Sequence, residues 1–287
     1  MRDISLNKPM GAIPCNSFLL YGDTRSGKTQ FAATFPRPLI IADVTEGGYE
    51  TVSTMDRSLW FEPGREPIVK GVENMNDLAA LSPWVDAQIK LGNIYTIVFD
   101  AFSFYCDFFL AQLTRANPTI DNRKLYGQLG VHLREIRTNY AAKGIAVVWL
   151  TLAKHPETDD PKGRPMIPGM NSDKFAAAVD FLFHTTKEQI RDGGKIVGER
   201  YDVHTRPHGP YMAGNRLGAK ADMLPNPFNG TYADLITHLG YDPELIRKTL
   251  ASAKPAVKPA PVITRPAPKV VSVPPATINR PQGAINK

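Results

Sequence analysis

The 287-residue sequence has little cysteine and no long apolar run. Its two cysteines, Cys15 and Cys106, are too few for a disulfide framework or a cysteine metal site, so we expect reduced thiols, as in a cytosolic protein. No apolar run approaches the roughly 20 residues that a membrane-spanning helix requires. Residues 1–18 lack a long apolar segment followed by a small-residue cleavage site, so no secretory signal is expected. These absences predict a cytoplasmic protein without a membrane partner.

Acidic residues are absent from residue 252 onward, where six Lys or Arg residues occur. Subtracting these six from the chain's 34 Lys and Arg residues leaves 28, against 28 Asp and Glu, in residues 1–251. The basic character therefore belongs to the tail. Its many prolines remove backbone donors and favour extended conformations, so we predict a folded domain at 1–251 and a disordered tail at 252–287. The tail is either a solubilising linker or a segment that binds nucleic acid or a partner.

Short apolar runs alternate with helical segments through the predicted domain. Such alternation is typical of a parallel sheet covered by helices on both faces. Gly193 and Gly194 separate two strand-like runs and predict the turn of a β-hairpin that extends the sheet. The expected fold is therefore α/β, with a mostly parallel twisted sheet and an antiparallel hairpin. The parallel strands are predicted at residues 17–22, 38–44, 94–100 and 145–153.

A glycine-containing loop follows the first predicted strand and precedes a helix. It reads GDTRSGKT and matches G-x-x-x-x-G-K-[ST] at every fixed position. The glycines let consecutive N–H groups point at phosphate oxygens, and the positive end of the helix faces the same anion. We expect Lys28 to reach the β- and γ-phosphates and the Thr29 hydroxyl to bind Mg²⁺. The sequence thus predicts an ATP and Mg²⁺ site at Gly22, Asp23, Thr24, Arg25, Ser26, Gly27, Lys28 and Thr29.

A carboxylate is expected to complete the metal site. The segment IYTIVFD reads as a buried strand that ends in Asp100, which we expect to hold Mg²⁺ through a water. An Asp at this position can instead cap the next helix. Because the phosphate loop is present, the metal role is favoured, with Thr29 and Asp100 as the metal-binding pair.

The predicted strand at 38–43 indicates the type of NTPase. It falls between the phosphate-loop strand and the Asp100 strand, and a separating strand is typical of enzymes that hydrolyse ATP with an activated water. Such an enzyme needs a carboxylate to orient or deprotonate that water. Ala101 and Phe102 follow Asp100, so the carboxylate must come from elsewhere. Glu46 is the candidate, and the alternative is that it is an ordinary loop acid.

Together and in this order, these features resemble the RecA-like core. The stretch LLYGDTRSGKTQFAATFPRPLIIADVTEGG is similar to phage nucleotide-binding proteins with a reduced RecA core, which are single-strand-annealing recombination ATPases. The likeness continues through DKFAAAVDFLFH and YMAGNRLGAKADMLPNPF and spans roughly residues 14–240. The resemblance implies a RecA-like P-loop NTPase that binds single-stranded DNA and assembles into a homo-oligomeric ring or filament. It also implies a phage-encoded protein. For the tail, a single-strand-binding protein is a candidate partner.

The resemblance implies residue roles by position. Glu46 would activate the attacking water, and Thr151 or His155 would sense the γ-phosphate at the end of the fourth strand. Arg216, in AGNRLG, would reach the ATP of a neighbouring subunit as an arginine finger, and Lys220 is a second candidate. The alternative interpretation of Arg216 is an ordinary surface basic residue.

Two loops are candidates for contact with single-stranded DNA. Residues 154–174 are long, rich in Pro and Gly, and carry four Lys or Arg residues; residues 115–124 are the second choice. Asp159 and Asp160 weaken the electrostatic argument, and the first loop has no aromatic residue for base stacking. A neutral core is not the signature of strong DNA binding, so this prediction rests on the resemblance.

Two other function classes stay open. A nucleotide-gated adaptor would bind ATP and turn it over negligibly, which agrees with the lack of an acid beside Asp100. A nucleoside or small-molecule kinase is disfavoured, because no cluster of arginines suggests a lid over the phosphates. His204 and His208 are four residues apart, but in a strand-to-loop stretch this spacing is not expected to align them for a metal ion.

Overall fold

The structure, a computed structural model, describes residues 16–43, 50–169, 171–218 and 223–252. The chain divides into a unit at Met1–Ala256 and a unit at Val257–Lys287, and the described residues all belong to the first. Most of the predicted tail, from residue 253, lies outside the described residues. The helices are α1 (Lys28–Ala33), α2 (Glu50–Thr54), the 3-10 helix η1 (Arg57–Leu59), α3 (Met75–Lys90), α4 (Phe102–Ala116), α5 (Asn122–Ala142), α6 (Asn171–Ala176), α7 (Tyr232–His238) and α8 (Pro243–Ser252).

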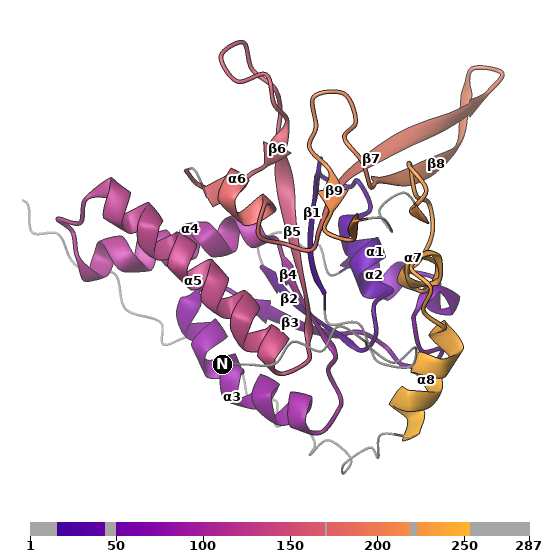
Figure 1. Cartoon of the computed structure of the whole chain (residues 1–287), viewed down its shortest axis with the longest axis horizontal. Helices are drawn as coiled ribbons and strands as arrows, with labels where there is room; N and C mark the ends of the chain where they lie inside the picture. The colour runs from indigo at the N-terminus through magenta and orange to yellow at the C-terminus, as the bar shows by residue number, and fades with distance from the viewer. Residues whose placement is uncertain (1–15, 44–49, 170, 219–222, 253–287) are drawn as a thin grey trace, which may run out of the picture. The chain divides into compact units, whose positions relative to one another are not determined.

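The strands form one central sheet in the order β3-β2-β4-β5-β1-β7-β8. The pairs from β3 to β7 are parallel, and β8 runs antiparallel to β7. This arrangement confirms the predicted α/β, RecA-like P-loop fold with an antiparallel hairpin (Figure 1). The strands are β1 (Ser17–Gly22), β2 (Pro38–Asp43), β3 (Ile68–Val72), β4 (Thr96–Asp100), β5 (Ala146–Lys154), β6 (Arg164–Pro165), β7 (Phe181–Asp192), β8 (Lys195–His204) and β9 (Gly214–Asn215).

Each face of the sheet is covered by helices, as the alternation of apolar residues requires. In β1, Phe18 and Leu20 point into one core, whereas Leu19 and Tyr21 point into the other, because successive strand residues face opposite sides. The first core includes side chains from α1, α7 and α8; the second includes side chains from α3, α4 and α5 (Figure 1). Burying one such side chain contributes about 2 kcal/mol to folding. The two cores fix the ends of the strands, where the candidate site lies.

The strand that separates the phosphate-loop strand from the Asp100 strand differs from the prediction. In the sheet it is β5 that lies between β1 and β4, and β2, the strand at 38–43, lies on the far side of β4. The prediction was wrong because chain order does not fix strand order when every connection crosses over a face of the sheet. A separating strand is still present, so the argument for an activated water rests on β5.

Strand β3 was not predicted. It lies at the edge of the sheet and pairs only with β2, and its residues are mostly half-buried. Lys70 and Gly71 interrupt its apolar run, so the sequence pattern of a buried strand is missing. Among the described helices, none combines the length and the apolar character needed to cross a bilayer.

Candidate functional site

The loop between β1 and α1 has the conformation that its glycines predict. Gly27 has a φ of 84°, in the left-handed region, and a Cβ atom there would lie 2.9 Å from the ring of Tyr201. A Cβ atom at Gly22 would lie 2.2 Å from the carbonyl oxygen of Thr185 on β7. Both glycines are therefore required by close contacts with the β7–β8 hairpin as well as by the turn itself.

The side chain of Lys28 lies inside this loop. It is 9% exposed, and its Nζ donates to the carbonyl oxygens of Gly22 at 2.9 Å and Asp23 at 2.7 Å. A third bond, of 3.3 Å, goes to the hydroxyl of Ser26. The positive charge is thus held at the centre of the loop, where the N–H groups and the start of α1 also favour an anion. The geometry fits the terminal phosphates of a nucleotide.

Thr29 and Asp100 meet, although 71 positions separate them in the chain. The Thr29 hydroxyl, on α1, donates to Asp100 Oδ2 at the end of β4 over 2.6 Å. Burial away from water raises the pKa of Asp100, while the hydrogen bond from Thr29 and the charge of Lys28 act in the opposite direction. A desolvated carboxylate beside a hydroxyl is a donor set that suits Mg²⁺, which prefers oxygen ligands and keeps several waters.

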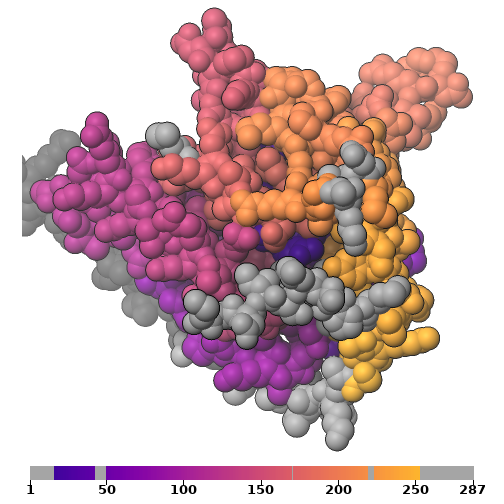
Figure 2. Space-filling view, in the orientation of Figure 1, coloured from indigo at the N-terminus to yellow at the C-terminus, as the bar shows by residue number. Residues whose placement is uncertain are grey.

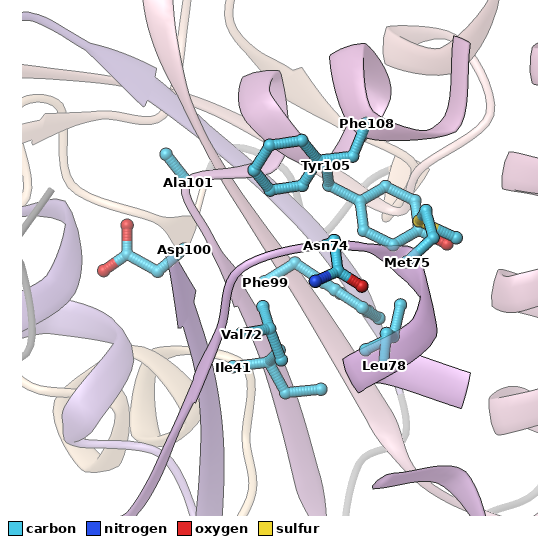
Figure 3. Close-up of a pocket in the computed structure, with 10 residues that line it drawn as sticks. All are labelled: Ile41, Val72, Asn74, Met75, Leu78, Phe99, Asp100, Ala101, Tyr105 and Phe108. Atoms are coloured by element: carbon cyan, nitrogen blue, oxygen red, sulfur yellow. The ribbon is translucent and has the colours of Figure 1, made fainter. Parts of the chain in front are cut away.

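The carboxylate of Asp100 points away from the apolar residues beside it (Figure 3). These residues line a cavity of only about 20 Å³, room for no more than a single water. The functional side of Asp100 therefore faces Thr29. The cavity is lined by Ile41, Val72, Asn74, Met75, Leu78, Phe99, Ala101, Tyr105 and Phe108 in addition to Asp100.

A larger cavity, of about 360 Å³, opens beside Gly27. Its size falls in the range of small-molecule sites, and it adjoins the phosphate loop, so it could hold the base and ribose of a nucleotide. Tyr201 forms part of its wall, and the Tyr201 hydroxyl donates to Glu199 Oε2 at 2.8 Å. The lining residues are Ser26, Gly27, Gln30, Phe31, Thr34, Leu59, Ile190, Glu199, Arg200, Tyr201, Val203, Asn229, Gly230, Thr231 and Asp234.

Comparison with known proteins agrees with this geometry. Residues 16–217 match the family described as AAA domain. The chain belongs to this family. A P-loop ATPase domain of this type binds and hydrolyses nucleotides, with ATP and Mg²⁺ as the usual ligands.

Two other comparisons add little to this family assignment. A search of curated proteins gives no match. Among solved structures, one match is a prototypical ATPase from the type III secretion system of pathogenic bacteria, with 13% sequence identity and a TM-score of 0.43. The match covers 61% of this chain and 53% of that one, so this AAA-domain protein spans about half the length of its structural neighbour.

The two sensor candidates of the AAA-domain protein lie in different surroundings. Thr151 is fully buried, and its hydroxyl bonds with Ser103 Oγ at 2.7 Å and with the carbonyl oxygen of Met166 at 3.0 Å. His155 is exposed, and its Nε2 lies 3.0 Å from Asp23 Oδ1 in the phosphate loop. Of the two, His155 is the one that contacts the phosphate loop.

Three further predicted residues are Glu46, Lys220 and Arg216. Glu46 and Lys220 lie outside the described residues. Arg216 is exposed, and its guanidinium donates to the carbonyl oxygen of Ala177. Within the part of the chain that the structure describes, no hydrogen bond or ion pair joins Arg216 to the loop.

His204 and His208 lie closer together than their positions in the sequence suggest. Their rings stack with centroids 4.0 Å apart, and His184 stacks on Tyr211 at the same separation. The rings meet by their faces, however, and the described residues include no group of three or more His, Cys, Asp or Glu side chains that converges on a metal ion.

His184 is the most strongly perturbed histidine of this stack. Burial, the charges of the neighbouring histidines and that of Lys28 lower its pKa to about 4, from an ordinary value of 6.5. Its Nδ1 has no hydrogen-bond partner among the described residues. In the unfolded chain the His184 side chain binds a proton below pH 6.5. In the folded chain it stays neutral until the pH falls to about 4. Folding stability from this group is therefore present above pH 6.5 and is lost as the pH falls toward 4.

Replacing His184 with phenylalanine is expected to flatten this pH dependence. The linkage relation predicts that the unfolding free energy of the wild type falls by about 2 kcal/mol more than that of the variant between pH 7 and pH 5. Phenylalanine keeps the stacked ring against Tyr211. Urea denaturation at the two pH values measures the difference, and equal slopes with pH for both proteins would contradict the assignment to His184.

Proposed function

We propose that this AAA-domain ATPase acts on single-stranded DNA in homologous recombination, where it pairs or anneals strands. It is phage-encoded and works in the cytoplasm of the bacterial host. The order of its motifs, which resembles the reduced RecA core, supports this proposal, and so does a connection between the phosphate loop and the predicted DNA loop.

The proposal rests on a series of contacts that joins the phosphate loop to the loop after β5. His155 stands at the start of the loop that follows β5; its Nε2 contacts Asp23, and its Nδ1 bonds with the Tyr211 hydroxyl at 2.7 Å. The Tyr211 ring packs so closely on Gly163 that a Cβ atom there would lie 2.2 Å from it. Backbone bonds tie the same segments, from Gly163 N to the Pro210 carbonyl at 3.0 Å and from Met212 N to the Gly163 carbonyl at 3.3 Å.

The contact between His155 and Asp23 suits signalling better than stabilisation. Both side chains are more than half exposed, and exposed ion pairs contribute little to stability. A nucleotide in the phosphate loop changes the charge beside Asp23, and His155 and Tyr211 can pass this change to Gly163. The loop between β5 and β6 stands clear of the body of the protein, where DNA can reach it (Figures 1 and 2).

The proposal predicts that single-stranded DNA stimulates ATP hydrolysis. Couplings of this type are worth about 1–3 kcal/mol, so we expect the steady-state rate to rise about 5- to 150-fold with saturating oligonucleotide. Replacing Tyr211 with phenylalanine removes only the hydroxyl that His155 contacts, so this variant should keep the basal rate and lose most of the stimulation. If neither hydrolysis nor strand annealing by the wild type responds to single-stranded DNA, the proposal is wrong.

The proposal includes assembly and a partner. The protein forms a homo-oligomer, a ring or filament, in which Arg216 of one subunit reaches the ATP of the next. The basic tail recruits a single-strand-binding protein. A chain shortened to end at Ser252 tests the role of the tail separately from the ATPase activity. It should no longer recruit the single-strand-binding protein, and its DNA-stimulated hydrolysis should be intact.

A nucleotide-gated adaptor with negligible turnover is the second candidate. Ala101 and Phe102 follow Asp100, so the strand that bears the metal carboxylate offers no neighbouring acid to activate water. Such a protein would bind ATP and change its loop, yet hydrolyse little. Measured turnover of the wild type separates the two functions.

A further inference from the structure

A cavity of about 160 Å³ lies between α5 and α6, away from the phosphate loop. The two helices adjoin each other on the face that Figures 1 and 2 turn toward the viewer. The lining of the cavity combines two cationic side chains with small and apolar ones. The lining residues are Gly127, Gly130, Leu133, Arg134, Asn171, Lys174, Phe175 and Ala178.

The positive charge in this cavity has no partner among the described residues. Arg134 and Lys174 are exposed, and neither has a hydrogen bond or an ion pair there. The nearest acid in the chain to Lys174 is Asp173, whose Oδ2 is bound by Arg164 at 3.1 Å. No carboxylate lines the cavity. Two uncompensated cations in a small concave site favour an anion.

An exposed aromatic ring lies on the same helix, one residue before the cavity-lining Gly127. Tyr126, on α5 next to Gly127, is 38% exposed, and a Cβ atom at Gly169 would lie 3.3 Å from its ring. The buried Asn171 donates to the carbonyl oxygen of Tyr126 at 3.0 Å and to that of Pro168 at 3.3 Å. The end of the loop after β5 is thus fixed to α5, directly beside an exposed ring.

The glycines of α5 keep the cavity open. Glycine weakens the interior of a helix, so two in one helix call for a reason. At Gly130 the reason is contact, since a Cβ atom would lie 2.6 Å from Asn171 Oδ1. At Gly127 a Cβ atom would meet nothing within 4 Å, so packing does not require glycine there. A side chain at Gly127 would instead enter space at the wall of the cavity.

We propose that this cavity binds one nucleotide unit of single-stranded DNA. Arg134 and Lys174 hold a backbone phosphate, and Tyr126 stacks on a neighbouring base. Cations that follow the backbone, together with an aromatic platform, are the combination that binds single strands without sequence preference. The inference rests on the proposed function and adds a location that lies outside the phosphate loop.

The test measures binding of a fluorescein-labelled oligothymidylate to the full-length protein by anisotropy, with a nonhydrolysable ATP analogue, across a salt series. The double variant Arg134→Gln, Lys174→Gln should bind less tightly, and the slope of log affinity against log salt should fall by about 0.7, because the two cations neutralise one phosphate and each neutralised phosphate contributes about 0.7. The variant Lys90→Gln, Lys248→Gln is the matched control, since it removes the same charge from α3 and α8 and should leave the slope unchanged.

The stacking contact has its own variants. Tyr126→Ala should lower the affinity about tenfold, and Tyr126→Phe should restore it, because only the ring is needed. With an abasic oligonucleotide, Tyr126→Ala and the wild type should bind equally. Gly127→Leu should also weaken binding while the Tm is unchanged or higher, because it fills the cavity with a better helix former and alters no charge.

The outcomes separate the site from the proposed function. If the wild type binds no single-stranded DNA, both are wrong. If the wild type binds but the Arg134, Lys174 and Gly127 variants match the control variant in affinity and salt slope, the cavity is not the site and the proposed function stands. If duplex DNA competes as well as the single strand, or Tyr126→Ala binds like the wild type, the stacking contact is wrong.

Discussion

Replacing Lys28 with alanine is expected to lower kcat/KM for ATP by at least about 100-fold, the usual effect of removing one charge-stabilising donor from a site of this kind. The ammonium group lies within 2.9 Å of two loop carbonyls, at the point on which the loop and the start of α1 converge. An anion held there loses its closest positive charge in the variant. The loss should appear in both nucleotide affinity and turnover, because the charge contacts phosphate before and during the reaction.

The matched control for Lys28 is Lys90→Ala, an exposed lysine at the end of α3, which should leave hydrolysis unchanged. Lys28→Ala also removes a donor from the loop, so its Tm must be measured, and Lys28→Arg tests whether charge without the lysine geometry suffices. If Lys28→Ala hydrolyses ATP and anneals strands like the wild type, then the loop is not the nucleotide site and the proposed recombination function is wrong.

The phosphate loop was predictable because its information is local. Eight consecutive residues specify the glycine turn, the lysine and the hydroxyl, and the apolar run before them specifies a buried strand. Asp100 was predictable by one further step: parallel strands end at the same edge of a sheet, so a carboxylate that closes a second buried strand comes close to the loop. The bond of 2.6 Å between Thr29 and Asp100 agrees with that reasoning.

The surroundings of the loop were not predictable in the same way. Tyr201 and Thr185, which pack on the two loop glycines, come from the β7–β8 hairpin more than 150 positions further along the chain. No local pattern marks them, because an aromatic or a threonine in a half-buried strand is ordinary. The position of β5 between β1 and β4 is likewise a property of how the crossovers stack. Contacts between distant segments need the sheet order, which the sequence pattern leaves open.

The aromatic residue beside the predicted DNA loop shows the same limit. The loop itself contains none, and on that ground base stacking was not expected. The structure places Tyr126 of α5 against Gly169 at the end of the loop, and Asn171 ties the two segments together. A search of the loop sequence alone cannot find a ring that a different element supplies.

Glu46 is the residue that decides between the two proposed functions, the ATP-hydrolysing enzyme and the nucleotide-gated adaptor. Strand β2 ends at Asp43, and its Ala42 pairs in register with Asp100. Ala101 and Phe102 cannot supply a base, and the exposed Asp23 already contacts His155. Glu46 itself lies outside the described residues, so its role as the water-activating acid stays a prediction from the resemblance.

Replacing Glu46 with glutamine is therefore expected to lower kcat by about 10²- to 10⁴-fold, the range for loss of a general base, and to leave ATP binding close to that of the wild type. Glutamine keeps the size and polarity of the side chain and removes its ability to take a proton. Single-turnover hydrolysis measures the chemical step, and binding of a fluorescent ATP analogue measures affinity. Glu50→Gln, at an exposed acid on α2, is the matched control and should hydrolyse like the wild type. A wild type with negligible turnover that Glu46→Gln does not lower further would favour the adaptor, whereas rapid hydrolysis that survives the substitution would mean that another group activates the water.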